Sequence, residues 1–123
     1  MRLLIDTQIL VWLVRGDARL RPEWIDAIGD ERNSLHVSSV VAFEYSDLQL
    51  RKRIPVDEPL TELVERFDLA VEGFPANCWQ KAGDLPPIHR DPVDRMLIAH
   101  ALASGMTLLT ADASIRRYPV ACL

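Results

Sequence analysis

The sequence is poor in the residues that would place it in several large classes of protein. It has two cysteines, Cys78 and Cys122, which show neither a C-x-x-C spacing nor a matching histidine pattern. We therefore expect reduced, mostly buried thiols rather than a disulfide or a zinc site. The longest apolar run, Ile9 to Val14, has six residues, whereas roughly 20 are needed to cross a bilayer. We expect no membrane span.

Targeting and nucleotide-binding signals are also missing. The N-terminus reaches Asp6 too early for a signal-peptide core and shows no small-residue cleavage site, so we expect a cytoplasmic protein. No G-x-x-x-x-G-K-[ST], G-x-G-x-x-G or G-x-S-x-G motif occurs, which leaves nucleotide triphosphatase, dinucleotide-binding and serine hydrolase functions without support. The net charge of −4 provides no overall attraction to nucleic acid, so any such binding must be local or carried by metal ions.

What is present is an ordinary globular composition, 49% hydrophobic and 26% charged over 123 residues, which predicts one domain spanning residues 1–123. Short apolar segments predict strands at Arg2–Ile5, Leu35–Val37, Leu69–Val71, Thr107–Leu109 and Val120–Cys122. Helices are predicted between a Thr7 cap and Gly16, and over 21–29, 40–52, 59–67, 75–83 and 92–104, with a short turn at 114–117. This alternation is typical of a parallel sheet covered by helices on both faces.

The segment from Ile88 to Asp112 has the strongest local signals. Asp91 suits a helix N-cap, Pro92 the first helical position, and Asp94 the third, where a carboxylate can accept from free backbone N–H groups. Capping and the helix dipole alone could explain both acids, since a cap contributes about 0.5–2 kcal/mol. The alternative is that Asp94 faces a cleft and binds a cation together with acids from elsewhere in the chain.

Other acids follow the strands. Asp6 ends the first strand and Asp112 lies just past the fourth, so both belong at the edge where the carboxyl ends of parallel strands meet and ligands bind. We expect Asp94 near the same edge, whereas helical periodicity leaves Glu44 on either the inner or the outer face of its helix. Two carboxylates about 4 Å apart repel by about 4 kcal/mol at an effective dielectric near 20. A hard divalent ion is the natural partner, and one or two Mg²⁺ or Mn²⁺ ions suit phosphodiester hydrolysis.

Four blocks of the sequence resemble one known family. They are L-L-I-D-T at the N-terminus, the helical Glu44 after V-S-S, H-R-D-P-V-D-R-M-L-I-A-H-A-L, and L-L-T-A-D followed by Y-P-V. Together they resemble a PIN-domain protein, most of all the VapC toxins of bacterial toxin–antitoxin pairs, over essentially the whole chain. The resemblance implies a three-layer αβα fold with a central, mainly parallel sheet of four to five strands. It also implies Mg²⁺-dependent endoribonuclease activity, with Mn²⁺ as a possible substitute.

The resemblance also implies partners and site residues. The expected partners are an RNA substrate, a VapB-type antitoxin and a second copy of the chain in a homodimer, with DNA contacted only through the antitoxin. By position, the metal-binding and catalytic acids of the family fall on Asp6, Glu44, Asp94 and Asp112. Around Glu44 the chain departs from many relatives, which have tryptophan where this chain has Phe43, and this leaves the choice of antitoxin open.

Several neighbouring residues are expected to support these acids. Thr7 and Thr110 resemble the hydroxyl residues that hold a metal-bound water or an adjacent carboxylate, and Asp91 stands beside the motif as the helix cap. Arg90 and Arg95, beside the start of the same helix, are candidates for RNA contact.

Two alternatives remain open at this stage. One is a Mg²⁺-dependent phosphatase with Asp6 as nucleophile, although that chemistry normally needs a second acid two residues on, where this chain has Gln8. The other is a non-catalytic interaction module that kept the fold and lost the metal. The histidines share no metal-ligand spacing, and His100, within an apolar helix, is expected to be hydrogen-bonded in the core.

Overall fold

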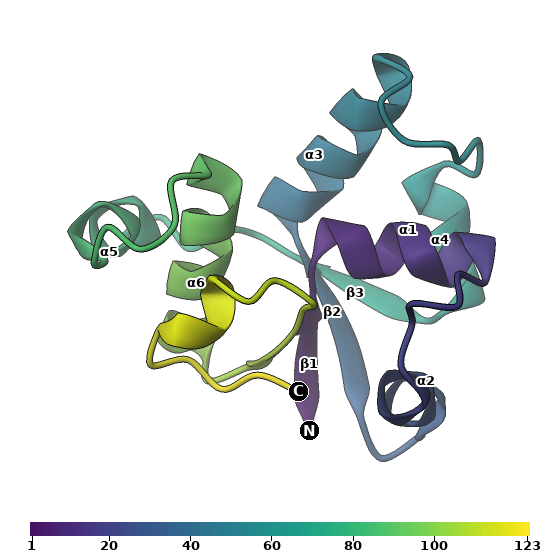
Figure 1. Ribbon diagram of the computed structural model, residues 1–123, viewed down its shortest axis with the longest axis horizontal. Helices are drawn as coiled ribbons and strands as arrows, with labels where there is room; N and C mark the ends of the chain where they lie inside the picture. The colour runs from purple at the N-terminus through teal and green to yellow at the C-terminus, as the bar shows by residue number, and fades with distance from the viewer.

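The computed structural model describes residues 1–123 as a parallel sheet between two groups of helices (Figure 1). The strands are β1 (Arg2–Ile5), β2 (Ser34–Ser38), β3 (Leu69–Glu72) and β4 (Thr107–Leu109). The helices are α1 (Thr7–Arg15), α2 (Pro22–Gly29), α3 (Ser39–Leu50), α4 (Leu60–Arg66), α5 (Cys78–Asp84), α6 (Pro92–Ser104) and the 3₁₀ helix η1 (Ile115–Arg117). In Figure 1, α5 and α6 lie to the left of the sheet, α1, α2 and α4 lie to its right, and α3 rises from the end of β2. The predicted αβα fold with a parallel sheet is confirmed.

The sheet has the strand order β3-β2-β1-β4, and every neighbouring pair is parallel. Helices cover both faces, so the side chains of the central strand β1 are buried whichever way they point. Leu3, Leu4 and Ile5 are all 0% exposed, which explains why β1 is a continuous apolar run rather than an alternating one.

Helix α6 begins and ends where the sequence predicts. The Asp91 side chain accepts a hydrogen bond from the Asp94 N–H at 3.0 Å, and Pro92 occupies the first helical position. Gly105 ends the helix in the left-handed region at φ 64°, which glycine adopts without steric cost. The chain then turns directly into β4, so the start of α6 lies near the same edge of the sheet as the end of β4.

Two local predictions are wrong. The N-cap of α1 is Asp6, not Thr7: the Asp6 side chain accepts from the Ile9 N–H, and Thr7 is the first helical residue. The expected last strand, Val120–Cys122, is reduced to a single bridge between Leu108 and Cys122. Two backbone hydrogen bonds, from the Leu108 N–H to the Ala121 carbonyl and from the Leu123 N–H to the Leu108 carbonyl, join this segment to β4, and Pro119 has no N–H with which to extend the ladder.

The remaining differences are small shifts of helix ends. The third helix ends at Leu50 rather than Lys52, because Lys52 has a positive φ of 56° that does not continue a helix. Cysteines Cys78 and Cys122 are both free, and Cys78 is buried against α6. None of the helices combines the length and the apolar character that a bilayer-spanning segment requires.

Candidate metal centre

Asp6 is the most buried acid of the site, at 6% exposed. It follows β1, and one of its carboxylate oxygens accepts the Ile9 N–H at 2.9 Å. Burial raises its pKa to about 6; the Thr110 side chain and the Ile9 N–H lower the pKa, and the nearby charges of Asp112 and Glu44 raise it further. The Asp6 carboxyl group therefore exchanges its proton close to neutral pH.

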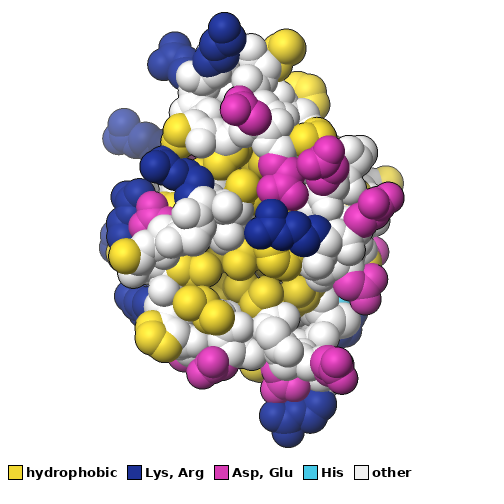
Figure 2. Space-filling model, turned by 90° about the vertical axis from the view of Figure 1, so that its right-hand side faces the viewer, with side chains coloured by type: hydrophobic (Ala, Val, Ile, Leu, Met, Phe, Trp, Pro, Cys, Tyr) yellow, Lys and Arg dark blue, Asp and Glu magenta, His cyan; other side chains and the backbone are white.

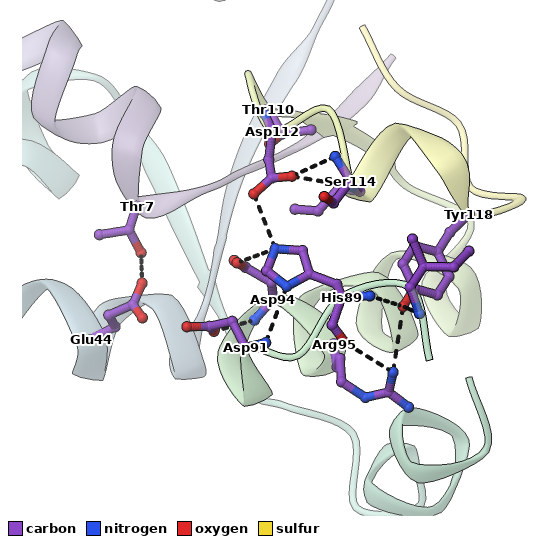
Figure 3. Close-up of polar contacts among 12 residues, drawn as sticks. Thr7, Glu44, His89, Asp91, Asp94, Arg95, Thr110, Asp112, Ser114 and Tyr118 are labelled. Atoms are coloured by element: carbon purple, nitrogen blue, oxygen red, sulfur yellow. Dashed lines mark hydrogen bonds and ion pairs between the residues drawn. The ribbon is translucent and has the colours of Figure 1, made fainter. Parts of the chain in front are cut away.

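Glu44 lies on the inner face of α3, which settles what helical periodicity left open. The Thr7 hydroxyl on α1 donates to its Oε1 in a short hydrogen bond (Figure 3). Thr7 is buried, so this contact fixes one oxygen of Glu44 at the joint between α1 and α3. The other oxygen has no hydrogen-bond partner in the protein.

Asp94 lies in the first turn of α6, beside the N-cap Asp91. Burial raises its pKa to about 7, helped by the charges of Asp91, Asp112 and Glu44, while His89 opposes the shift. No lysine or arginine forms an ion pair with this carboxylate; His89, whose Nε2 is 2.9 Å from Oδ2, and the helix N-terminus are the polar groups beside it.

Asp112 follows β4, and its pKa is lowered, unlike the pKa values of Asp6 and Asp94. Burial alone would raise its pKa, but hydrogen bonds from His89 and from the Ile115 and Ser114 N–H groups outweigh burial and lower the pKa. Its Oδ1 accepts from Ser114 at 2.7 Å and from Ile115 at 3.2 Å, and its own N–H donates to the Thr110 hydroxyl at 3.1 Å. Asp112 is thus held in its charged form.

His89 was not expected to be part of this site. Its Nε2 lies 2.9 Å from Oδ2 of Asp94 and 3.0 Å from Oδ2 of Asp112 (Figure 3). Its spacing from His36 and His100 does not match a metal-ligand pattern, so the sequence alone does not place it among the acids. The available signal was its place just before the Asp91 cap, since a loop that leads into a helix N-terminus must pass the acids there.

The acids meet in one cleft of about 450 Å³. The lining includes the expected residues Asp6, Thr7, Glu44, Asp91, Asp94 and Asp112, together with Gln8, Val11, Trp12, Leu48, Ile54 and Ala111. Thr110 is fully buried behind it. The convergence follows from the sheet: Ile5 of β1 pairs with Leu109 of β4, so the residues that follow these strands emerge side by side.

The donor set of this cleft fits a hard divalent cation. Its ionisable groups are carboxylates, no lysine or arginine lines it, and two of its acids have raised pKa values. One oxygen each of Asp94 and Asp112 lie within 4.8 Å of each other and of the His89 ring nitrogen, so the two carboxylates are close enough to share an ion. Mg²⁺ and Mn²⁺ both accept oxygen ligands of this kind.

Arg90 and Arg95, the two candidates for RNA contact, differ in whether the guanidinium is free or bonded to the protein. Arg90 is exposed beside the start of α6. The Arg95 guanidinium instead donates to backbone carbonyls of α5 and of the loop before α6, including those of Ala82 at 2.8 Å, Leu85 at 2.9 Å and Pro86 at 3.0 Å. The guanidinium of Arg95 thus holds the end of α5 and this loop against the start of α6.

The remaining histidines, His36 and His100, do not contact the acids of the cleft. His100 is 1% exposed, its Nδ1 is 2.9 Å from the Ser38 hydroxyl, and burial lowers its pKa, so the predicted core histidine is confirmed. His36 lies between Ser34 and Glu72 on the sheet, with ring nitrogens 2.8 Å and 2.7 Å from their side chains.

Comparison with known proteins identifies the fold. Residues 3–121 match the sequence pattern of the PIN domain. No curated protein sequence shows significant similarity to the chain. At sequence identities below 20%, the structural similarities that follow establish the fold alone.

Three solved structures illustrate the similarity. VapBC2 from Rickettsia felis, bound to a DNA fragment from its promoter, has a TM-score of 0.71 at 19% identity over 100% of this chain and 98% of that chain. VapC20 from Mycobacterium tuberculosis, a sarcin-ricin loop cleaving toxin, has a TM-score of 0.72 at 18% identity over 96% and 95%. FitAcB from Neisseria gonorrhoeae has a TM-score of 0.59 at 18% identity over 98% and 96%.

Proposed function

The chain belongs to the PIN-domain family, and from this premise we propose that it is a Mg²⁺-dependent endoribonuclease of the VapC toxin type, for which Mn²⁺ can substitute. The observation that carries the proposal is the convergence of Asp6, Glu44, Asp94 and Asp112 in one cleft without a balancing lysine or arginine. That a structural relative is a sarcin-ricin loop cleaving toxin supports RNA as the substrate class. We place the activity in the cytoplasm, where RNA is abundant.

Within this proposal, the acids have different tasks. Asp94 and Asp112 would hold the cation, because one oxygen of each lies within 4.8 Å of the other, and Asp6 would contribute from the end of β1. When bound, the cation supplies an activated water for in-line attack and neutralises charge at the scissile phosphate. Glu44, with one oxygen fixed by Thr7, uses its other oxygen to orient the attacking water or to hold a second ion.

The raised pKa values of Asp6 and Asp94, about 6 and about 7, identify two carboxylates whose negative charge a bound cation would stabilise, so binding of the cation would release protons near neutral pH. Arg90, exposed at the start of α6, is placed to hold a flanking phosphate. Hydrolysis proceeds without a covalent enzyme intermediate.

The phosphatase alternative has weaker support. A nucleophilic carboxylate must reach the phosphorus atom of its substrate, but Asp6 is 6% exposed and one of its oxygens caps α1. Position 8, where that chemistry needs a second acid, is Gln8.

The test of the nuclease proposal is cleavage of total cellular RNA in the presence of Mg²⁺. We expect the unaltered protein to cut, and Asp6→Asn and Asp94→Asn each to abolish cutting while remaining folded. Asp47→Asn is the matched control, because it removes one acid from α3 that pairs with Arg51. Continued cutting by both site variants would contradict the proposal.

We further propose that a VapB-type antitoxin neutralises the protein, and that the chain forms homodimers that contact DNA only through this partner. The structural relatives include toxin–antitoxin complexes such as VapBC2 and FitAcB. Hydrophobic side chains gather in a hollow on the face at the right of Figure 1, with charged groups around it (Figure 2). A cavity of about 640 Å³ on that side is lined by the end of α2, the starts of β2 and β3 and the segments next to them. Its lining combines apolar side chains, among them Ile28, Leu35 and Phe67, with the acids Asp30, Glu31 and Asp68. An antitoxin segment with apolar side chains fits such a surface.

A further inference from the structure

The His89 side chain connects two acids that come from different parts of the fold. Its Nε2 contacts Oδ2 of Asp94, at the start of α6, and Oδ2 of Asp112, after β4. The imidazole is 15% exposed, so it lies inside the acidic cluster rather than at its mouth.

The tautomer of this ring follows from a backbone contact. The Asp91 N–H donates to Nδ1 of His89 at 3.1 Å. Because a backbone N–H can only donate, Nδ1 must carry the lone pair, and the ring proton is on Nε2. The nitrogen that faces Asp94 and Asp112 is therefore a hydrogen-bond donor and offers no lone pair to a metal ion.

The same contact changes how the N-terminus of α6 is capped. In a capping box, the acid at the third helical position reaches back to the N–H of the N-cap residue. Here Asp91 is the N-cap and Asp94 the third residue, but the Asp91 N–H is taken by His89. Asp94 is thereby kept out of the capping box, and its Oδ2 lies 2.9 Å from Nε2 of His89.

The proton on Nε2 is directed at Asp112. The Oδ2 of Asp112 forms a hydrogen bond with this N–H at 3.0 Å, and the backbone N–H groups of Ser114 and Ile115 hold Oδ1 of the same carboxylate. The Asp94 carboxylate accepts no hydrogen bond from the protein, so if His89 no longer took the Asp91 N–H, Asp94 would be free to return to the capping box and point away from Asp112.

The loop that carries His89 is itself firmly held. The His89 N–H donates to the hydroxyl of the buried Tyr118 at 2.8 Å, and its carbonyl accepts from Arg95 at 3.2 Å. The Tyr118 hydroxyl in turn donates to the Pro86 carbonyl at 2.7 Å. These contacts fix the backbone on which the ring is mounted, so the position of Nε2 is determined before any cation arrives.

We propose that His89 is a positioning residue of the metal centre. Its Nδ1 takes the Asp91 N–H away from Asp94 and its Nε2–H holds Asp112, so that the two carboxylates face each other and can hold one divalent cation. His89 acts through the two acids and is not itself a metal ligand. The inference rests on the proposed function only in requiring a divalent cation in the cleft.

The test measures binding of Mn²⁺ alone, from the electron paramagnetic resonance signal of the free ion. We expect His89→Ala to weaken Mn²⁺ binding about 10- to 100-fold, the range typical for hydrogen-bond partners of ligating groups. His89→Gln, which keeps an N–H near the position of Nε2 but not the acceptor at Nδ1, should recover part of this loss. His36→Ala is the control, because it removes another histidine that bridges two side chains, away from the cleft. It should bind Mn²⁺ as the unaltered protein does.

Two spectroscopic measurements use the unaltered protein and do not depend on how the variants fold. The ¹⁵N chemical shifts of His89 should show the Nε2–H tautomer, and electron spin echo modulation of bound Mn²⁺ should show no directly bound imidazole nitrogen. A bound imidazole, the other tautomer, unchanged Mn²⁺ binding by folded His89→Ala, or no recovery in His89→Gln would each overturn the proposal.

Mn²⁺ binding and RNA cleavage together distinguish failure of the role proposed for His89 from failure of the nuclease proposal. A protein that binds Mn²⁺ with the expected dependence on His89 but cuts no RNA would refute the proposed function and leave the role of His89 standing. A nuclease in which His89→Ala binds Mn²⁺ normally would refute only the role of His89. An unaltered protein that binds no Mn²⁺ would overturn both.

Discussion

At the scale of single residues, Asp6 and Asp94 lie where their charged forms are disfavoured. Their pKa values are raised to about 6 and about 7, chiefly by burial. An acid with a raised pKa in the folded state contributes its full stability below its unfolded pKa, about 4. That contribution is lost as the pH rises through the folded value. Asp112 has a lowered pKa and contributes in the opposite direction, above its unfolded pKa.

The first prediction concerns Asp94→Asn, measured by urea unfolding with a chelator present. At pH 7.5 we expect the variant to be more stable than the unaltered protein by about 1–3 kcal/mol, because one pKa unit corresponds to about 1.4 kcal/mol and partial exposure reduces the effect. The advantage should shrink toward pH 4, where the folded protein already holds the proton on Asp94.

The control for this measurement is Asp47→Asn, which removes a partly exposed charge paired with Arg51 and should change the free energy of unfolding by less than about 1 kcal/mol. If Asp94→Asn were less stable than the unaltered protein at pH 7.5, crowding of charge in the cleft would not be the dominant effect.

At the scale of elements, the site depends on where strands end and helices begin. Asp6 and Asp112 follow β1 and β4, and Asp94 lies in the first turn of α6. The carboxylates therefore meet backbone N–H groups and helix dipoles, which favour negative charge. The Asp91 cap contributes to this arrangement in two ways, since it begins the helix and its N–H binds His89.

The second prediction separates the side chain of Asp91 from its backbone. Asp91→Ala should lower the free energy of unfolding by about 0.5–2 kcal/mol, whereas Asp91→Asn, which retains a capping oxygen, should cost much less. Both variants keep the N–H that donates to His89, so both should still bind Mn²⁺. Urea unfolding and Mn²⁺ titration give the two quantities. Equal destabilisation by Ala and Asn would show that the cap is not what Asp91 contributes.

At the scale of the whole molecule, two concave surfaces lie at opposite edges of the sheet. The acidic cleft lies at the carboxyl ends of β1 and β4. The larger hollow includes Ser34 and Leu69, the first residues of β2 and β3. A substitution in the hollow should therefore act on partner binding without reaching the catalytic groups.

The third prediction tests this separation with Ile28→Glu, which places a charge in the hollow. We expect antitoxin affinity to fall about 10-fold or more, since a buried unpaired charge at an interface costs several kcal/mol. RNA cleavage by the free protein should be unchanged. Leu50→Glu, at an 82% exposed position on α3, is the matched control. Pull-down with the antitoxin and cleavage of total RNA give the two readouts, and a parallel loss of both would show that the surfaces are coupled.

Much of the fold could be predicted because its signals are local. Asp91 and Pro92 begin α6 and Gly105 ends it through backbone hydrogen bonding and φ limits that act within a few residues. The apolar runs of β1 and β4 likewise marked buried parallel strands. The misplaced Thr7 cap and the missing last strand depended on contacts with Glu44 and β4, which local patterns do not contain.

The sequence by itself determined which residue types stand at the ends of the strands and at the start of α6, and therefore which acids could form a site. Only the tertiary structure decided which of them share a cleft, which face of α3 carries Glu44, and that His89 lies between Asp94 and Asp112. The physical reason is the range of the forces involved. Caps and turns are set by hydrogen bonds between near neighbours in the chain, whereas the position of His89 depends on Tyr118, which lies 29 residues away along the chain.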